Sequence, residues 1–443
     1  MNAAPSHTVA LETYEKPVES VARVIEAAGG FPPLGPDTRV FIKPNVVTWT
    51  PAVDFPKWGV ITTSRVVEDV VRALHDAGAR RITLGEGLVS VDPREKGLAQ
   101  AAFTSLGYFK LADRYGIQVV DVFQRPFRKV AVADGISLNF NRDALESDLI
   151  VDLPVLKTHA QTVVSLGIKN LKGLIDMASR KRCHSADPQW NLHRMVAALP
   201  AGLPPVFTVI DGIFSNERGP AFDGTLHRMN VLVASRDLLS ADMVGARLLG
   251  HHPDRVPHLV HAARAAGRPL DLSDVRMAGE SLDSLARPHD FSFPYTEDGS
   301  LPALMEQMGI RGLSYPKYDD TLCTYCSMLN GLVLTAVARA WSGSPWDEVE
   351  VLTGKAMQPT PGKKHTILLG KCMSQAHKNN PNILHPIPVP GCPPKPGRIA
   401  EAFREAGIPV DASILESWAL FPGRFVKKYA GKDGFDEAFF RIP

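Results

Sequence analysis

The residues of this 443-residue chain that most directly suggest chemistry are four cysteines near its carboxyl end. The first 322 residues contain a single cysteine, and the rest contains a C-x-x-C pair and two separate cysteines: Cys323, Cys326, Cys372 and Cys392. In a cytosolic protein such a group is more often a metal site than a set of disulfides. Four thiolates complete the coordination shell of a [4Fe-4S] cluster or of a tetrahedral zinc ion. No second C-x-x-C pair is present and prolines follow Cys392, which favours the cluster and leaves zinc as the alternative.

The fifth cysteine, Cys183, lies in the basic run RKRCH (180–184). Neighbouring cations could lower the pKa of its thiol and make it reactive. The alternative, which we favour, is a loop cysteine without a chemical role.

A second group of candidate residues lies in the segment VDLPVLKTHAQTVVSLGIKNLKGLI (151–175). A buried strand is expected to end near residue 153, and a loop with Lys157 and His159 is expected to follow Pro154. A helix is expected over 162–176, because apolar residues leave only one polar stripe. That stripe would consist of Ser165, Lys169, Lys172 and Asp176.

Lysines on an otherwise apolar helix need an anionic partner, because an unpaired buried charge is costly. The partner is either an internal carboxylate or the carboxylate or phosphate of a substrate. In the second case His159 would transfer a proton, with Lys157 beside it in the catalytic group. The strand end KPN (43–45) is expected to lie beside the same site. The expected substrate-binding residues are therefore Lys43, Asn45, Lys169, Asn170 and Lys172.

A polar run that contains glycines, DGIFSNERGP (211–220), follows a strand expected over 206–210. Asp211 and Glu217 in this run are candidates to orient His159, to bind a cation or to act as a base. They complete the expected catalytic group. Asp237 precedes a helix expected over 238–249, where its simplest role is that of an N-cap.

Alternating strands and helices must position these residues in the first two thirds of the chain. A β-rich run at 39–43, a helical pattern over 63–78 and a strand at 81–85 form one βαβ unit. The alternation predicts an α/β fold with a mostly parallel sheet covered by helices on both faces. Ligands of such folds bind at the carboxyl ends of the strands.

The polar stretch 281–300 separates two expected domains, an α/β domain at 1–290 and a smaller α/β iron–sulfur domain at 300–443. In the second domain we expect helices and strands over 326–342, 348–352, 366–369 and 397–406.

The charge balance and the absence of apolar runs exclude several classes of protein. Lys plus Arg is 49 and Asp plus Glu is 47, so a formal net charge of +2 argues against nucleic acid as a partner. No apolar run approaches the roughly 20 residues of a membrane span, and the start lacks the pattern of a secretory signal. We therefore expect a cytoplasmic protein. The run Gly85-Glu86-Gly87 lacks the third glycine of a dinucleotide-binding fingerprint.

The sequences ILLGKCM around Cys372 and PVPGCPPKPGRIAEAF around Cys392 resemble the small iron–sulfur subunit of NADH–quinone oxidoreductase and of nickel–iron hydrogenases. There a Gly-x-Cys ends one strand, a Pro-Gly-Cys-Pro-Pro loop opens a helix, and both cysteines bind a [4Fe-4S] cluster. The resemblance covers about the last 120 residues and implies that these two cysteines are cluster ligands. The upstream pair departs from the pattern, because it is C-x-x-C instead of two adjacent cysteines.

Four motifs in the first part occur in the order found in the family catalogued as domain of unknown function 362: KPN, LPVLKTH with SLGIKNLKG, DGI with NERGP, and SRDLLSADMVGARLLG. The chain resembles this family over about 40–267, and family members often carry cysteine-ligated iron–sulfur modules. The chain departs from the family pattern in MASRKRCHSADPQWNLHR (177–194), where a shorter link is common. The resemblance implies the fold and the location of the site but no particular reaction.

These features predict an iron–sulfur oxidoreductase that exchanges single electrons with a small anionic substrate at the lysine–histidine site. An electron-donor protein is an expected partner, and a homo-oligomer is left open. One alternative is a non-redox lyase or isomerase with a structural or Lewis-acid cluster, the latter needing an iron with only three cysteine ligands. The other is an electron-transfer or assembly partner, which internally paired lysines or the lack of a pocket would favour.

Overall fold

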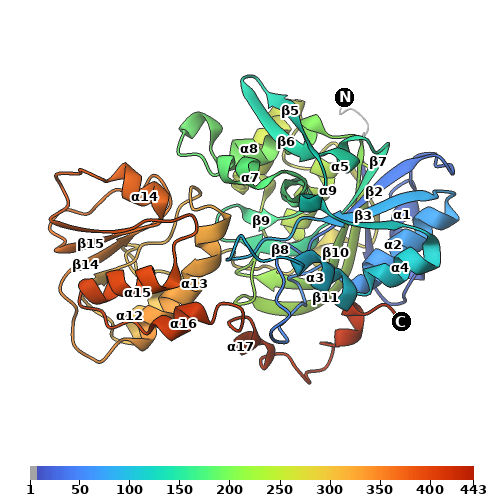
Figure 1. Cartoon of the computed structure of the whole chain (residues 1–443). Helices are drawn as coiled ribbons and strands as arrows, with labels where there is room; N and C mark the ends of the chain where they lie inside the picture. Colours follow the sequence, from blue (N-terminus) through green and yellow to red (C-terminus); the bar gives the residue numbers. More distant parts are fainter. Residues whose placement is uncertain (1–6) are drawn as a thin grey trace.

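Two separate β-sheets organise the computed structural model, which describes residues 7–443 (Figure 1). The larger sheet has ten strands and the smaller has four. A hairpin of β5 (Phe127–Ala133) and β6 (Ile136–Asn141) projects from the larger unit. In spatial order the larger sheet contains β12 (Val275–Gly279), β1 (His7–Thr13), β11 (Thr225–Ser235), β10 (Val206–Glu217), β7 (Leu149–Leu153), β2 (Arg39–Pro44), β3 (Arg81–Glu86) and β4 (Gln118–Asp121), while β8 (Val155–His159) and β9 (Val163–Ser165) branch from β10.

The central strands of the larger sheet run parallel and are connected by helices. β7, β2, β3 and β4 are parallel neighbours, whereas β1, β10 and β11 add antiparallel pairs, so the sheet is mixed. Between β2 and β3 the chain forms α2 (Ser64–Asp76). The side chain of Thr63 caps this helix by accepting a hydrogen bond from the backbone N–H of Val66 at 3.3 Å. The expected βαβ unit and the α/β fold class are confirmed.

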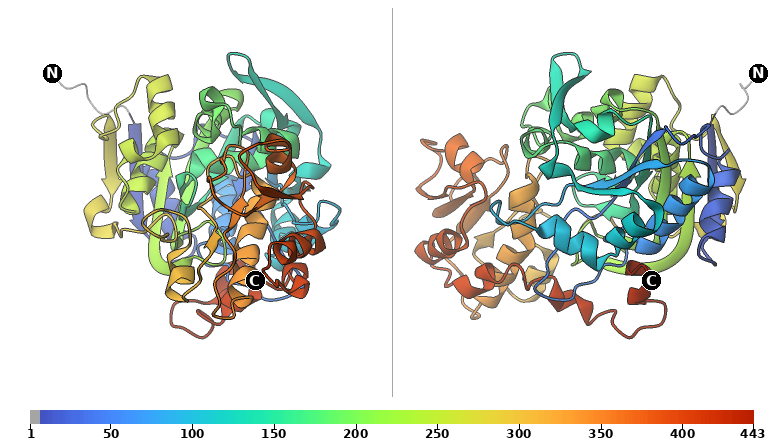
Figure 2. Two further views of the ribbon diagram at one scale, coloured as in Figure 1. Left: turned by 90° about the vertical axis from the view of Figure 1, so that its left-hand side faces the viewer. Right: turned by 45° about the vertical axis from the view of Figure 1, so that its right-hand side comes forward.

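Successive side chains along the strands point to opposite faces of the sheet and pack into two hydrophobic cores, one on each face. In β2, Val40 and Ile42 join one core and Phe41 joins the other. Helices lie on both faces of the larger sheet, as the two views of Figure 2 show. The first core packs against α1 (Glu19–Ala27), α2, α3 (Leu98–Ser105) and α4 (Tyr108–Tyr115), and the second against α8 (Leu192–Ala198), α9 (Leu238–Leu248) and α10 (Pro257–Ala266).

The smaller sheet consists of parallel strands only: β13 (Leu313–Ser314), β14 (Val349–Leu352), β15 (His365–Leu369) and β16 (His385–Val389). Its main core is shared with the helices α12 (Ala303–Gln307), α13 (Thr324–Arg339), α15 (Pro396–Glu405) and α16 (Ala412–Glu416). The helix α13 lies on the side of this unit that faces the larger unit (Figure 1). The elements expected in this part of the sequence are confirmed.

The helix expected over 162–176 is wrong. After Pro154 the chain continues as β8, which pairs with β10 and, through a hairpin, with β9, so the loop expected there is a strand. Only one short helix, α6 (Gly167–Asn170), and a 3-10 turn at Leu171–Leu174 follow. β-branched residues and glycines in this segment have low helix propensity, and its apolar residues are buried by short elements instead.

The polar run at 211–220 also differs from the expectation. The strand expected to end at residue 210 continues through Glu217 as β10, with a register shift between Gly212 and Phe214. The bulge keeps the strand paired with β11 and bends it, which is how such insertions act in sheets.

The carboxyl-terminal residues return to the larger unit after α17 (Gly423–Val426). Tyr429, Phe440 and Ile442 are buried in the first core of the larger sheet. Figure 1 shows this dark red segment running beneath that unit to the C-terminus. The end of the chain therefore ties together two units that the polar stretch 281–300 separates in the sequence.

We predict that Phe440→Ala lowers the free energy of unfolding by about 3–4 kcal/mol, because it leaves a cavity in a well-packed core. Phe440 is 1 % exposed, and its ring centroid lies 6.3 Å from that of Phe214 and 6.4 Å from that of Trp58. Urea unfolding followed by tryptophan fluorescence measures the change. The control Leu420→Ala, at a side chain that is 51 % exposed, should change stability by less than about 0.5 kcal/mol. Equal effects of the two substitutions would contradict the packing of the tail.

Candidate functional site

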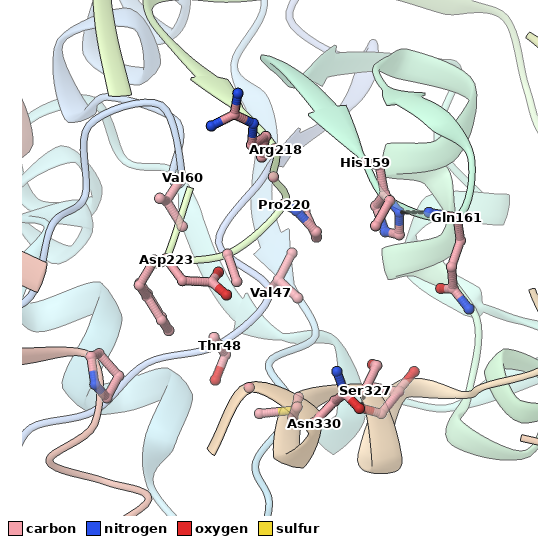
Figure 3. A pocket seen from close by; sticks show the side chains of 18 of the residues that line it. Val47, Thr48, Val60, His159, Gln161, Arg218, Pro220, Asp223, Ser327 and Asn330 are labelled. Carbon is pink, nitrogen blue, oxygen red and sulfur yellow. Dashed lines mark hydrogen bonds between the residues drawn. The ribbon is translucent and has the colours of Figure 1, made fainter. Parts of the chain in front are cut away.

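A cleft of about 850 Å³ lies between the larger sheet and α13. Its walls include residues that follow the carboxyl ends of β2 and β3, residues of β8, and one face of α13. Figure 3 shows His159 and Gln161 on one side of this cavity and Asp223 on the other, with Ser327 and Asn330 of α13 below them. The location agrees with the rule that α/β folds bind ligands at the carboxyl ends of their strands.

The cleft concentrates positive charge in a chain that is nearly neutral overall. Nine lysines and arginines line it, together with only two carboxylates, Glu86 and Asp223. The whole chain has a formal net charge of only +2. A cleft with one predominant sign of charge attracts small ions of the opposite sign. The charge of this lining therefore favours anionic ligands.

One buried lysine of the cleft has a carboxylate partner within the protein. The Lys43 Nζ lies 2.9 Å from Glu86 Oε2, and both side chains are almost fully buried. Lys43 also donates a hydrogen bond to the carbonyl of Pro44 at 2.7 Å. Beside this pair, Asn45 donates to Asn170 at 2.9 Å, and Asn170 donates to Asp152 at 2.8 Å. Lys43, Asn45 and Asn170 thus form a hydrogen-bonded floor, and the charge of Lys43 is already compensated.

The other buried lysines have no carboxylate partner among the described residues. Lys157 donates to the Oδ1 of Asn45 at 2.6 Å and to the carbonyl of Val60 at 2.8 Å. Lys172 lies 2.6 Å from the Nε2 of His184, whereas Lys169 has no hydrogen-bond partner within residues 7–443. Burial lowers the pKa of Lys157 to about 7 and that of Lys172 to about 8, and it lowers the pKa of Lys169 well below its usual range.

His159 lies at the end of β8 beside these lysines. Its Nδ1 accepts a hydrogen bond from the backbone N–H of Gln161 at 3.1 Å, which places the proton of the neutral ring on Nε2. Burial, together with the charges of Lys169 and Lys172, holds the pKa of His159 well below its usual value. The imidazole is therefore neutral at physiological pH and can donate its Nε2 proton to an anionic ligand.

The loop that precedes Cys323 is bound directly to this lysine–histidine site. The side-chain amide of Gln161 donates to the carbonyls of Asp319 at 2.8 Å and Leu322 at 3.0 Å. His184 donates from Nδ1 to the carbonyl of Asp320 at 2.8 Å, while its Nε2 accepts from Lys172. The cationic site of the larger unit and the first cysteine of the smaller unit are thus joined by short hydrogen-bonded chains.

The four expected ligand cysteines line one small cavity of about 20 Å³. Cys323 and Cys326 lie at the start of α13, whereas Cys372 follows β15 in α14 (Lys371–Ala376) and Cys392 follows β16. Because β15 and β16 are parallel neighbours, their carboxyl ends bring the last two cysteines together. The sequence pattern therefore identified four thiols that the fold gathers from segments almost 70 residues apart.

The chemistry of this cavity is that of a set of thiols. Burial, with the neighbouring cysteines, raises the pKa of Cys326 to about 12 and also raises the pKa of Cys323. Such thiols ionise when a cation binds them, as the ligands of zinc and iron–sulfur centres do. A β-carbon at Gly370, which has a φ of 94°, would lie 3.3 Å from the sulfur of Cys326. Within residues 7–443, no three His, Cys, Asp or Glu side chains are already arranged around a single metal ion.

Cys183 does not have the surroundings of a reactive thiol. It is fully buried in the second core of the larger unit, and burial raises the pKa of its thiol in spite of Lys172 and Arg180 nearby. The interpretation as a residue without a chemical role agrees with this position.

Asp211 and Glu217 lie outside the lining of the cleft. Asp211 accepts hydrogen bonds from the backbone N–H groups of Thr63 at 2.7 Å and Ile213 at 3.1 Å, so it fixes the start of α2. Glu217 lies 3.0 Å from His227 and accepts from the backbone N–H of Asp290. Neither carboxylate contacts His159, and both have structural partners. Asp237 caps α9 as expected, by accepting from Ser240 at 2.8 Å.

Several residues of the site have no signal in the sequence that singles them out. Glu86 lies in a glycine run rejected as a nucleotide fingerprint, and Asp223 lies three residues after the motif NERGP. His184 and Arg180 come from the segment 177–194, where the chain departs from the family pattern. The unusual sequence of this segment was the only hint of a role for His184 and Arg180. Their position in the cleft follows from the fold and could not be predicted from that hint.

Comparison with known proteins places part of this chain in a family context. Residues 40–247 match the family described as "Domain of unknown function (DUF362)". A thylakoid-associated protein of Synechocystis sp. is 26 % identical over 288 residues, which are 62 % of this chain and 86 % of that protein. The resemblance expected for the first part is confirmed, whereas that of the carboxyl-terminal cysteine segment stays a prediction. No helix within residues 7–443 combines the length and apolar character needed to cross a membrane.

Two solved structures overlap weakly with the chain. One is a Thermotoga maritima protein, with 17 % identity, a TM-score of 0.34, and coverage of 56 % of this chain and 60 % of the other. The second is the lactate racemase apoprotein of Thermoanaerobacterium thermosaccharolyticum, with 13 % identity, a TM-score of 0.30, and coverage of 55 % and 57 %. The chain spans less than two thirds of either protein, and such a likeness supports no assignment of function.

We predict that Glu86→Gln lowers the free energy of unfolding by about 3 kcal/mol, because it leaves the buried ammonium of Lys43 without a counter-charge. Urea unfolding at neutral pH measures this change. The matched control is Glu146→Gln, which removes an exposed partner of Arg142 at 2.5 Å and should change stability by less than about 0.5 kcal/mol. An equally small effect at Glu86 would show that Lys43 is not held as an ion pair.

Proposed function

We propose that the protein is an iron–sulfur oxidoreductase whose substrate is an anion bound in the cleft between its two units. The observation that carries this proposal is the direct connection of two sites. The loop that leads to Cys323 is held by Gln161 and His184, which lie beside the buried lysines. A redox centre held by the cysteines would therefore lie next to a substrate held by the lysines.

The lysines of the cleft would bind and orient the anionic group of the substrate. Lys157, Lys169 and Lys172 line one buried region and form no ion pair with a carboxylate among the described residues, and burial lowers their pKa values. An anion among them favours their charged forms, so binding takes up protons and restores the usual positive charge. Asn45, which Asn170 holds in the floor, keeps Lys157 in place by accepting a hydrogen bond from its ammonium at Oδ1.

His159 would hold or move a proton at the bound substrate. Its ring is fixed by Gln161 and its low pKa keeps it neutral, so the Nε2–H is available as a donor. The Nε2–H of a neutral imidazole can donate a hydrogen bond to a substrate atom that becomes more basic on reduction, and so stabilise the charge that develops there.

The cysteine cavity would hold the redox centre. Its all-thiol donor set fits a [4Fe-4S] cluster, with a zinc ion as the alternative. When bound, such a cluster supplies or accepts one electron at a time, and an electron-transfer protein would be the source or acceptor of these electrons. Cys372 and Cys392 are exposed, so electrons can enter from the outer side of the smaller unit.

The two alternative functions receive less support from the geometry. A Lewis-acid cluster in a lyase or isomerase needs an iron without a cysteine ligand, yet all four cysteines line the same cavity. A carrier protein without its own substrate is expected to lack a pocket or to pair its lysines internally. The cleft and the lysines without carboxylate partners argue against that alternative.

We predict that protein purified without oxygen contains about four iron and four acid-labile sulfide atoms per chain. Cys326→Ser and Cys392→Ser should each remove most of the iron and the broad visible absorbance. Cys183→Ala is the matched control and should retain them, because this thiol is buried in another core. Stoichiometric zinc without sulfide would contradict the redox function.

We also predict that acetate binds in the cleft and that its affinity falls at least tenfold between about pH 6.5 and about pH 9. Acetate stays ionised over this range, whereas Lys157 and Lys172 lose their protons as the pH rises above their pKa values of about 7 and about 8. Isothermal titration calorimetry measures the affinity. Lys169→Gln should weaken binding at low pH, while Lys378→Gln, at an exposed lysine outside the cleft, should not. An affinity that is the same at both pH values would contradict the lysine site.

A further inference from the structure

The charged and apolar residues that line the cleft indicate which class of molecule the substrate belongs to, in addition to its negative charge. The buried cations gather at one end, where the loop before Cys323 meets Gln161 and His184. The cleft then continues along α13, where residues spaced three or four positions apart form one lining face: Thr324, Ser327, Met328, Gly331, Thr335 and Ala338. From Thr324 to Ala338 this face extends about 21 Å at 1.5 Å per residue.

The residues that surround the cleft can be placed in order along α13. Near its start lie Cys323 and the lysine site. In its middle, a β-carbon on Gly331 would lie 3.6 Å from the carboxylate of Asp223 and 3.9 Å from the ring of Phe421. Near its end lies Arg339, whose charge acts on Arg424 of α17. The cleft is therefore a passage that leads from the buried lysines outward past Phe421.

The lining of this cleft is also rich in large apolar side chains. Aromatic residues that line it include Trp49, Phe222, Tyr318, Trp418, Phe421 and Phe425. Six large apolar side chains are exposed among residues 7–443, and four of them line this cleft: Val47, Phe293, Leu304 and Met308. Contiguous exposed apolar residues mark a surface that binds an apolar ligand. A short polar anion would contact the lysines and leave this lining unused.

We propose that the substrate is amphiphilic, with an anionic head group at Lys157, Lys169 and Lys172 and a large apolar body along α13. This inference rests on the anion site of the proposed function and adds the class of molecule that carries the anion. The cations recognise the head group by charge, and the aromatic and aliphatic lining binds the body by removing it from water. The apolar mouth at Leu304 and Met308 is where the body enters or extends.

The test is a titration of the full-length protein with straight-chain monocarboxylates, from butyrate to dodecanoate, below their micelle concentrations and at about pH 6.5. Each buried methylene should improve the affinity roughly fourfold until the passage is filled. Dodecyltrimethylammonium has a chain of the same length with a cationic head, and it should bind at least tenfold more weakly than dodecanoate. Isothermal titration calorimetry measures each dissociation constant.

Two variants test whether the chain lies along α13. Gly331→Leu places a branched side chain between Asp223 and Phe421 and should weaken dodecanoate binding at least tenfold. The double substitution Leu304→Gln with Met308→Gln changes only exposed positions at the mouth and should reduce the gain per methylene. The matched control is Leu384→Gln, at a leucine that is 63 % exposed but lies outside the cleft, and it should leave the series unchanged.

The outcomes separate this inference from the proposed function. Carboxylates that bind with the same affinity at every chain length, and lose that affinity in Lys169→Gln, would overturn the amphiphilic substrate and leave the anion site intact. Equal binding of dodecanoate and dodecyltrimethylammonium would also overturn it, because the head group would then not be recognised. The absence of lysine-dependent binding for every carboxylate would overturn the proposed function itself.

Discussion

Buried positive charge without enough buried negative charge is the constraint on which the rest of this structure depends. Glu86 compensates Lys43, but Lys157 and Lys172 have only amide, carbonyl and imidazole partners, and Lys169 has no hydrogen-bond partner within residues 7–443. Burial of an uncompensated ammonium is unfavourable, and the protein retains it at the carboxyl ends of its strands, where a ligand can reach it. We interpret this local instability as the driving force for binding an anion, since the ligand supplies the charge that the fold omits.

The smaller unit covers the lysine site and places the cysteines beside it. It covers the cleft with α13, and the same helix begins with the cysteine pair, so one element contributes to both the substrate passage and the thiol cavity. Hydrogen bonds from Gln161 and His184 fix the loop before Cys323, and the carboxyl-terminal segment packs back into the first core of the larger unit. The two units are therefore held together at both ends of the smaller one.

Local patterns in the sequence predicted the parts of this structure that depend on residues close together in the chain. The period of apolar residues and the Thr63 cap identified α2, and the cysteine spacing identified four thiols that share a cavity. The segment 162–176 was mistaken for one helix, because dense apolar residues look alike in short buried elements and in a buried helix. Asp211 was expected beside His159, because its actual partner Thr63 is distant in sequence and leaves no local signal. The cleft itself depends on contacts such as Gln161 with Leu322, which no local pattern contains.

The most direct test of the connection between the two sites is whether an anion among the lysines changes the redox centre held by the cysteines. Full-length protein, purified without oxygen, is titrated with butyrate at about pH 6.5 while the EPR spectrum and the reduction potential are recorded. We predict that butyrate shifts the spectrum and lowers the potential, because a nearby negative charge stabilises the oxidised cluster, and that Lys169→Gln removes both effects. A spectrum and a potential that stay unchanged at saturating butyrate would contradict the connection.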